Sequence, residues 1–296
     1  MLWGQDSLPP LYHCLPSGQP LHIDGRLNEP AWKTAAWTTD FVDIEGLKRP
    51  LPFLRTRAKM LWDAEYLYIA AELEEPNLWA TFDQRDMIIF HENNFEVFID
   101  PTGDTHNYLE IEINAQGTIW DLLLTKPYRD QGKAIDEWNM KGLKSAVHVV
   151  GTLNDPADKD EGWTVEIALP WKALEEVADH AGHPRTGEVW RMNFSRVEWR
   201  LTTENGTYKK VSDPQSGKVL PEYNWVWAPQ GVIAMHQPET WAYVVFEGDH
   251  VMRGEQKTYR QDFAVQKRLR DFYKQQKAFF KQYGRFGRLS ELEPLD

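Results

Sequence analysis

Three short segments from Asn93 onward alternate apolar and polar residues, and this alternation constrains the fold more than any other feature of the chain. Turn-forming residues at 101–104 and 114–117 separate the segments. A period of two is typical of β-strands that lie between a core and solvent. The stretch therefore predicts a three-stranded antiparallel meander with one buried and one solvated face. Its apolar positions are Phe95, Val97 and Ile99, then Leu109, Ile111 and Ile113, then Ile119, Leu122 and Leu124.

The polar face of this meander is chemically distinctive. Successive side chains point to opposite faces of a strand, so Glu96 shares a face with Asn94 and Phe98. Glu110 and Glu112 share theirs with Tyr108, on the neighbouring strand. Aromatic rings stack on the apolar faces of sugars, while carboxylates and amides accept hydroxyl hydrogens. The face therefore suits a polyhydroxylated ligand, and it favours binding over catalysis.

The remaining chain adds strands to this meander. Residues 56–63 and 66–74 predict a hairpin, and further strands are expected at 146–151, 163–169, 187–199 and 241–246. The fold class that follows is all-β, an antiparallel β-sandwich of jelly-roll type. Residues 256–284 change to a helical period and predict an amphipathic helix. The expected organisation is an extended lead-in at 1–20, a sandwich at 21–250, and a basic helix at 251–296 that packs on the sandwich.

Charge separates these regions. The whole chain has a net charge of −12, which argues against nucleic acid and against anionic membrane surfaces as partners. Between Arg253 and Arg288, however, the sequence contains 11 Lys and Arg and only 3 Asp and Glu, which gives this segment a net charge of +8. The helix therefore docks on the acidic body or, alternatively, on an acidic protein partner.

Other functional sites have weaker support. Glu110 and Glu112 are about 6.5–7 Å apart along their strand, a spacing that glycoside hydrolases also use for paired acids. Alternating Glu on a strand face is nevertheless common in acidic proteins. Asp100, Asp104 and Asn107 offer oxygen ligands for structural Ca²⁺, although turns use the same residues. No cofactor is required by any of these patterns, and the metal ligands stay unknown. No run of residues is apolar enough for a membrane span, and Cys14 is the only cysteine.

Several segments of the chain together form a recognisable pattern. In chain order they are IDGRLNEPAW, TRAKMLWDAEYLYIAAELEEP, NNFEVFIDPTGDTHNYLEIEINAQG, GWTVEIALPW, WRMNFSRVEW and WVWAPQG with MHQPETWAYVVF. This pattern resembles the family 9 carbohydrate-binding modules, and in particular the family-9-like proteins of Bacteroidetes. The resemblance covers about residues 20–247 and implies a sandwich similar to DOMON domains that binds an oligosaccharide or polysaccharide without cleaving it.

The resemblance also implies a site. Characterised family members hold a terminal sugar between two Trp rings, and by position these rings fall on Phe90 and Trp227, with Glu96 as the hydrogen-bonding acid. The arginine of the family's next strand has no counterpart, because Leu109 and Glu110 stand there. The expected carbohydrate-binding set is completed by residues that lie near these positions. It comprises Phe90, Glu96, Trp227, Glu110, Asn94 and Trp79.

Two alternatives stay open: an interaction module that has lost sugar binding, and a glycoside hydrolase that uses Glu96 or Glu110. The N-terminus shows no secretory signal. If a signal was removed, we expect a periplasmic or extracellular protein that takes part in polysaccharide use.

Overall fold

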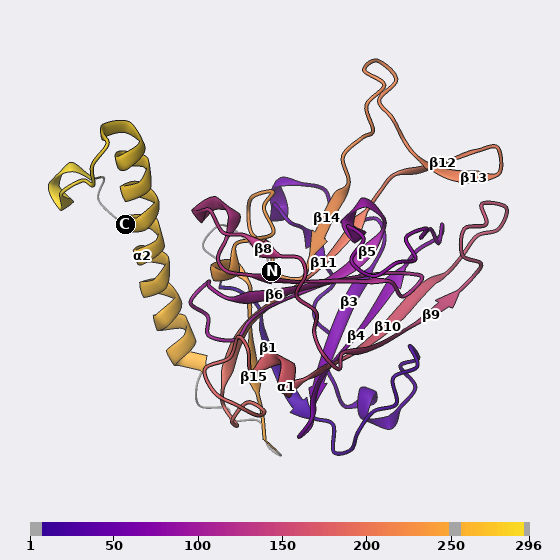
Figure 1. Cartoon of the computed structure of the whole chain (residues 1–296), viewed down its shortest axis with the longest axis horizontal. Helices are drawn as coiled ribbons and strands as arrows, with labels where there is room; N and C mark the ends of the chain where they lie inside the picture. Colours follow the sequence, from indigo (N-terminus) through magenta and orange to yellow (C-terminus); the bar gives the residue numbers. More distant parts are fainter. Residues whose placement is uncertain (1–7, 249–255, 293–296) are drawn as a thin grey trace. The chain divides into compact units, whose positions relative to one another are not determined.

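A computed structural model describes residues 8–248 and 256–292, with side chains from 263 onward in the second range. These residues form two units that divide near residue 251. Figure 1 shows the strands of the first unit and the long helix of the second. The strands are β1 (Leu11–Pro16), β2 (Val42–Asp43), β3 (Thr56–Trp62), β4 (Tyr66–Glu74), β5 (Asn94–Asp100), β6 (Tyr108–Asn114), β7 (Ile119–Leu124), β8 (Ala134–Ile135), β9 (Lys144–Val150), β10 (Gly162–Pro170), β11 (Val189–Glu198), β12 (Leu201–Glu204), β13 (Thr207–Lys210), β14 (Tyr223–Val226) and β15 (Ala242–Phe246).

The main strands form two sheets that share β1. One sheet runs β8-β7-β6-β5-β11-β15-β1, with β14 and β2 attached at β11, and the other runs β1-β3-β4-β10-β9. Leu11 to Cys14 pair with β15, whereas Leu15 and Pro16 pair with β3. The expected lead-in at 1–20 is therefore corrected, because residues 11–16 form the strand that joins the sheets. In the sequence, the surrounding Pro and Gly residues obscured the alternation of Tyr12 and Cys14. Both of these side chains are buried in the structure.

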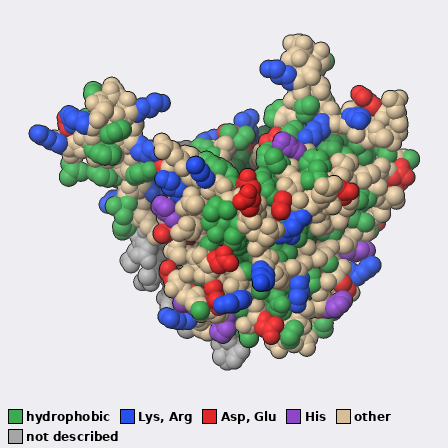
Figure 2. All heavy atoms as spheres, in the orientation of Figure 1, with side chains coloured by type: hydrophobic (Ala, Val, Ile, Leu, Met, Phe, Trp, Pro, Cys, Tyr) green, Lys and Arg blue, Asp and Glu red, His purple; other side chains and the backbone are tan. Residues whose placement is uncertain are grey.

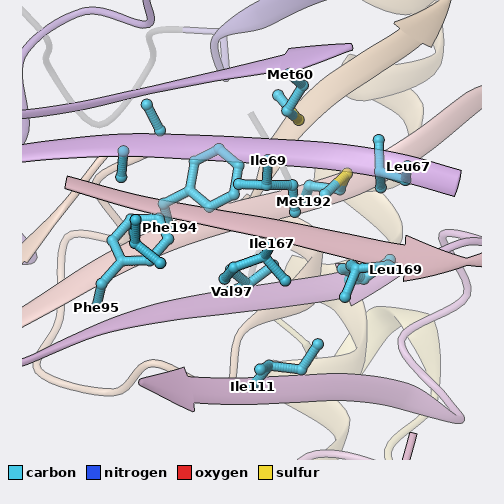
Figure 3. Close-up of a cluster of buried hydrophobic side chains, with 14 of the residues drawn as sticks. Met60, Leu67, Ile69, Phe95, Val97, Ile111, Ile167, Leu169, Met192 and Phe194 are labelled. Carbon is cyan, nitrogen blue, oxygen red and sulfur yellow. The ribbon is translucent and has the colours of Figure 1, made fainter. Parts of the chain in front are cut away.

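A continuous hydrophobic core fills the space between the sheets. Figure 3 shows Phe95, Val97 and Ile111 of the meander beside Ile69 and Ile167 of the opposite sheet. The predicted β-sandwich is thus confirmed, as are the hairpin of β3 and β4 and the antiparallel meander of β5, β6 and β7.

The meander differs from expectation on its outer face. Every residue of β5 and β6 is buried, so the face predicted to be solvated is covered. Trp241 and partly buried Met235, both from the segment that leads into β15, pack there against Phe98 and Tyr108. In β7 the residues that share a face also differ from the prediction, which placed Ile119 with Leu122 and Leu124. Trp120 pairs with Glu112, so Trp120, Leu122 and Leu124 lie together on the outer face.

The second unit contains the predicted helix, α2 (Gln256–Tyr283), whereas α1 (Trp171–Leu174) is one short turn in the first unit. Gly284, which has a φ of 68°, ends α2 in the left-handed conformation that glycine favours. The docking of this helix on the sandwich stays a prediction. No helix among the described residues is long and apolar enough to cross a bilayer.

A buried arginine ties the sheets together at one end of the sandwich. Arg196 of β11 donates to Thr56 Oγ1 of β3 at 3.0 Å and to the Glu74 carbonyl of β4 at 2.8 Å. The same guanidinium pairs with Glu75 at 2.9 Å and with Glu198 at 2.8 Å. Burial raises the pKa of Glu198 well above its usual range, and the Glu75 charge adds to this effect. The Arg196 charge opposes this rise and so favours the ionised form of the acid beside it.

Arg196→Met removes the cation and leaves two buried acids without it. We expect the free energy of unfolding to fall by about 3–5 kcal/mol, as for other broken buried ion pairs. Urea unfolding measures this loss. Arg55→Met is the matched control, because Arg55 is exposed and pairs with Glu72 and Glu74 at the surface. Its expected loss is about 0–1 kcal/mol, and equal losses in the two variants would contradict this account.

Candidate functional site

Strand register brings the predicted acids together on the outer face of the meander. Glu96 of β5 lies directly opposite Glu112 of β6, and Glu112 lies opposite Trp120 of β7. Glu110 lies two residues from Glu112 on the same strand and therefore on the same face. The expectation that Glu96, Glu110 and Asn94 share one face is met by this arrangement.

The three carboxyl groups form a tight buried cluster. Glu96, Glu110 and Glu112 are only 4%, 5% and 1% exposed. The Asn94 amide donates to Glu96 at 3.0 Å and to Glu112 at 3.3 Å. Glu110 and Glu112 lie on the same strand face, close enough for the charge of one to raise the pKa of the other.

Burial makes these acids hold their protons. Desolvation raises the pKa of Glu96 to about 7, with the hydrogen bond from Asn94 acting in the opposite direction. The pKa of Glu110 and that of Glu112 lie well above the usual range, first from burial and then from the negative charge of Glu96. Like charges this close cannot all be ionised in a dry site. Near neutral pH the cluster is therefore at least partly protonated.

A covering segment closes the face above Glu110. His236 Nδ1 and Tyr108 Oη form a hydrogen bond of 3.0 Å. The other ring nitrogen, Nε2, lies 3.9 Å from the Glu110 carboxyl group. Arg129 anchors the segment by donating to the His236 carbonyl at 3.2 Å and to Glu239 at 2.8 Å. Burial lowers the pKa of His236 to about 4, with a smaller contribution from Arg129. The imidazole is therefore neutral at physiological pH.

An aromatic rim borders the cluster where the cover ends. Phe90, which is 37% exposed, lies 6.2 Å from Trp120 with the two ring planes inclined by 30°. Trp120 lies opposite Glu112 in the strand register, so the rim and the acids share an edge. Tyr128, which is 49% exposed, packs 4.5 Å from His236. We call Phe90, Trp120 and Tyr128 the aromatic rim.

The sequence predicted Phe90 as a site residue but not Trp120, Tyr128 or His236. The position of Trp120 could have been predicted from the sequence. A strict period of two through Leu122 and Leu124 places Trp120 on the same sheet face as the acids. Tyr128 and His236 lie in long connections, and only the folded chain brings them to the meander.

Trp227 does not lie at this site. Its ring is 3% exposed and stacks at 5.6 Å on Phe194 in the core between the sheets. Its backbone N–H donates to the Phe194 carbonyl, which extends the pairing of β14 with β11 and turns the ring inward. The expectation that Trp227 offers a sugar platform is therefore corrected.

Trp79 belongs to a neighbouring cluster. It is half-buried, and Lys210 Nζ lies 5.9 Å from its ring and 3.4 Å from the ring of Trp199. Trp199 in turn donates to the Phe90 carbonyl at 3.0 Å. Trp79 is thus connected to the rim through Trp199 and Lys210, and none of the described ring contacts joins it to Phe90.

Calcium binding at the turn after β5 stays a prediction. Asp100 is fully buried and accepts hydrogen bonds from the Gly103 and Thr105 backbones at 2.8 and 2.9 Å. Both of its carboxylate oxygens are thereby used to close the turn, which is the ordinary role of Asp in such loops. Within the described residues a group of three ligating side chains is formed by His22, Asp24 and Glu29, and its imidazole is not a ligand that Ca²⁺ prefers.

Glu96→Gln tests the protonation of the cluster. The pKa of Glu96 is about 7 in the folded protein and lower in the unfolded chain. Its contribution to stability is therefore fully present below about pH 4.5, where Glu96 is protonated in both states. This contribution is lost as the pH rises through 7, because the buried group must then ionise. We expect the variant to be about 1–3 kcal/mol more stable than the parent at pH 8 and equal to it near pH 4.5. Urea unfolding at both pH values measures this, with exposed Glu137→Gln as a control expected to stay within about 0.5 kcal/mol. A stability gain that does not change with pH would contradict the assignment.

Similar structures share this architecture. A family 9 carbohydrate-binding module from Caldicellulosiruptor kristjanssonii in complex with cellotriose aligns with a TM-score of 0.51 and 13% identity, over 83% of this chain and 96% of that one. A candidate carbohydrate-binding protein from Bacteroides uniformis aligns with a TM-score of 0.57 and 13% identity, over 81% and 100% of the two chains. At such identities the likeness shows the fold.

Sequence relatives and the family model agree with this fold. The exoglucanase XynX of Acetivibrio thermocellus is 26% identical over 207 residues, which are 65% of this chain and 16% of that enzyme. The endo-1,4-beta-xylanase A of Thermoanaerobacterium saccharolyticum is 26% identical over 59% of this chain and 15% of its own length. The chain thus spans less than a fifth of each enzyme. Residues 23–189 match the model described as "Carbohydrate family 9 binding domain-like", and the chain belongs to this family of carbohydrate-binding modules.

Proposed function

We propose that the chain binds a glycan, without cleaving it, at the aromatic rim above the carboxyl cluster. The observation that carries this proposal is the position of Phe90 and Trp120. Both rings retain solvent-accessible surface and their centroids lie 6.2 Å apart. Trp120 also lies opposite Glu112 in the strand register. An apolar stacking surface beside hydrogen-bonding acids is the combination that a sugar ring requires.

Binding in this site has two parts. A sugar ring stacks on the rim, whose rings are accessible in the described structure. Hydroxyl groups reach Glu96 and Glu110 only when the cover carrying Met235 and His236 moves aside, because both acids are almost fully buried. Arg129 holds that cover, so its two hydrogen bonds oppose the opening.

The same geometry speaks against glycoside hydrolysis. Hydrolases place two carboxyl groups about 5–9.5 Å apart across the scissile bond. Glu96, Glu110 and Glu112 are instead almost fully buried, so a scissile bond has no access to any pair of them in this structure. We therefore assign the acids to binding.

The relatives support a ligand class. One structural neighbour is in complex with cellotriose and another is in complex with glucose. Both sequence relatives are enzymes named for glucan or xylan cleavage. We infer that oligosaccharides of plant-type polysaccharides, held by their chains or chain ends, are the ligands of this chain. A role in polysaccharide use in the periplasm or outside the cell is consistent with them.

One observation favours a second function. All three acids of the cluster are buried, which is also what a sandwich that had lost sugar binding would show. A glycan array probed with well-folded protein, with calcium and with EDTA, separates the two functions. Signals on cello- or xylo-oligosaccharides support the glycan site, and a blank array supports an interaction module.

Phe90→Ala and Trp120→Ala are expected to weaken binding of the best array ligand at least tenfold each, since each removes a stacking face. A tenfold loss corresponds to about 1.4 kcal/mol, which lies in the range of aromatic contacts. Isothermal titration calorimetry measures the affinity. Phe53→Ala is the matched control, because Phe53 is exposed but contacts Tyr223 and Trp225 instead of the rim. Unchanged affinity in both rim variants would refute this site.

A further inference from the structure

The C-terminal unit carries an apolar stripe that sugar binding does not use. Val265, Leu269, Tyr273, Phe280 and Tyr283 of α2 are each between 47% and 64% exposed. They follow one another at intervals of four, four, seven and three residues, so they lie on one face of the helix. A stripe of this size is unusual on a surface helix, where large apolar side chains normally face a core.

A basic stripe runs beside the apolar one. Arg270, Lys274, Lys277 and Lys281 recur at intervals of four, three and four residues along α2. Between residues 263 and 292, eight Lys and Arg accompany two Asp and Glu. Figure 2 shows basic and hydrophobic side chains close together on this unit. The helix therefore offers apolar area and positive charge to the same partner.

The residues after α2 fold back and extend the apolar surface. Gln276 exchanges two hydrogen bonds with Gly287, at 2.9 and 3.0 Å, and Phe286 packs 5.0 Å from Phe280. A Cβ on Gly287 would lie 3.2 Å from the Phe279 ring, so the absence of a side chain allows this close approach. Phe286 and Leu289 are both strongly exposed.

We propose that this unit binds the surface of an anionic lipid bilayer, with α2 lying in the plane of the headgroups. Helices that bind in this way have one polar face rich in Lys and Arg and an opposite face of aromatic and aliphatic residues. Anionic lipids attract the basic stripe, and the apolar stripe enters the boundary between headgroups and acyl chains.

Other partners match less of this surface. Two copies of α2 would bring like charges together, and a nucleic acid would leave the apolar stripe without a partner. The net charge of −20 on the rest of the chain does not prevent binding, because salt screens charges beyond about 8 Å.

Vesicle co-sedimentation with the full chain tests the proposal. We expect binding to vesicles of phosphatidylglycerol and phosphatidylcholine, little binding to phosphatidylcholine alone, and weakening in 0.5 M salt. Replacing Leu269, Tyr273 and Phe280 by Gln should reduce binding at least tenfold, and circular dichroism should show the helix retained, because Gln favours helices. The matched control replaces Leu47, Leu51 and Phe53 of the sandwich, which are equally exposed, and should bind like the parent.

Two results would overturn the proposal. Absence of binding to anionic vesicles by the parent chain would rule out a lipid bilayer as the partner of the stripe. Binding that survives the triple Gln variant but disappears when the basic stripe is neutralised would show a purely electrostatic contact. Neither result bears on the glycan site, whose test uses sugars and different residues.

Discussion

The structure depends on how the Arg196 charge is accommodated between the sheets. The guanidinium binds groups from β3, β4 and the residue after β4, so it fixes the two sheets at the end where the aromatic rim lies. From Glu75 the network continues to the Asn93 amide at 3.1 Å, and Asn93 accepts from the Trp199 backbone at 2.8 Å. Trp199 then holds the Phe90 carbonyl. A structural ion cluster thereby positions the exposed ring at the candidate site.

The outer face of the meander shows a second consequence of burial. Acids on a solvated strand face would be charged and free to accept hydroxyl groups. Covered by the segment that carries His236, Glu96 and Glu112 accept hydrogen bonds from the Asn94 amide. Burial raises the pKa of all three acids. The site thus combines an accessible aromatic rim with a buried carboxyl cluster, which we call the polar floor of the site. Access to that floor requires movement of the cover, whereas access to Phe90 and Tyr128 does not.

The sequence predicted what depends on local period and failed where distant segments meet. Alternation predicted β5, β6 and their acids, because strand geometry alone determines which side chains share a face. It could not predict the cover over that face, since Met235 and His236 follow the meander by more than a hundred residues. Trp227 was misplaced for a similar reason: a position matched by resemblance does not determine which way a ring points, and pairing with β11 turned it into the core. The strand at 11–16 was hidden because its partners, β15 and β3, lie far along the chain.

The central claim, that glycans bind at the rim and not at Trp227, is tested most directly by following tryptophan indole signals. The chain labelled with ¹⁵N-tryptophan would be titrated with cellotriose, and the indole N–H resonances of Trp120 and Trp227 assigned by replacing each with Phe. We predict that the Trp120 signal shifts in proportion to ligand bound while the Trp227 signal stays in place. A saturating shift at Trp227 with no change at Trp120 would contradict the account.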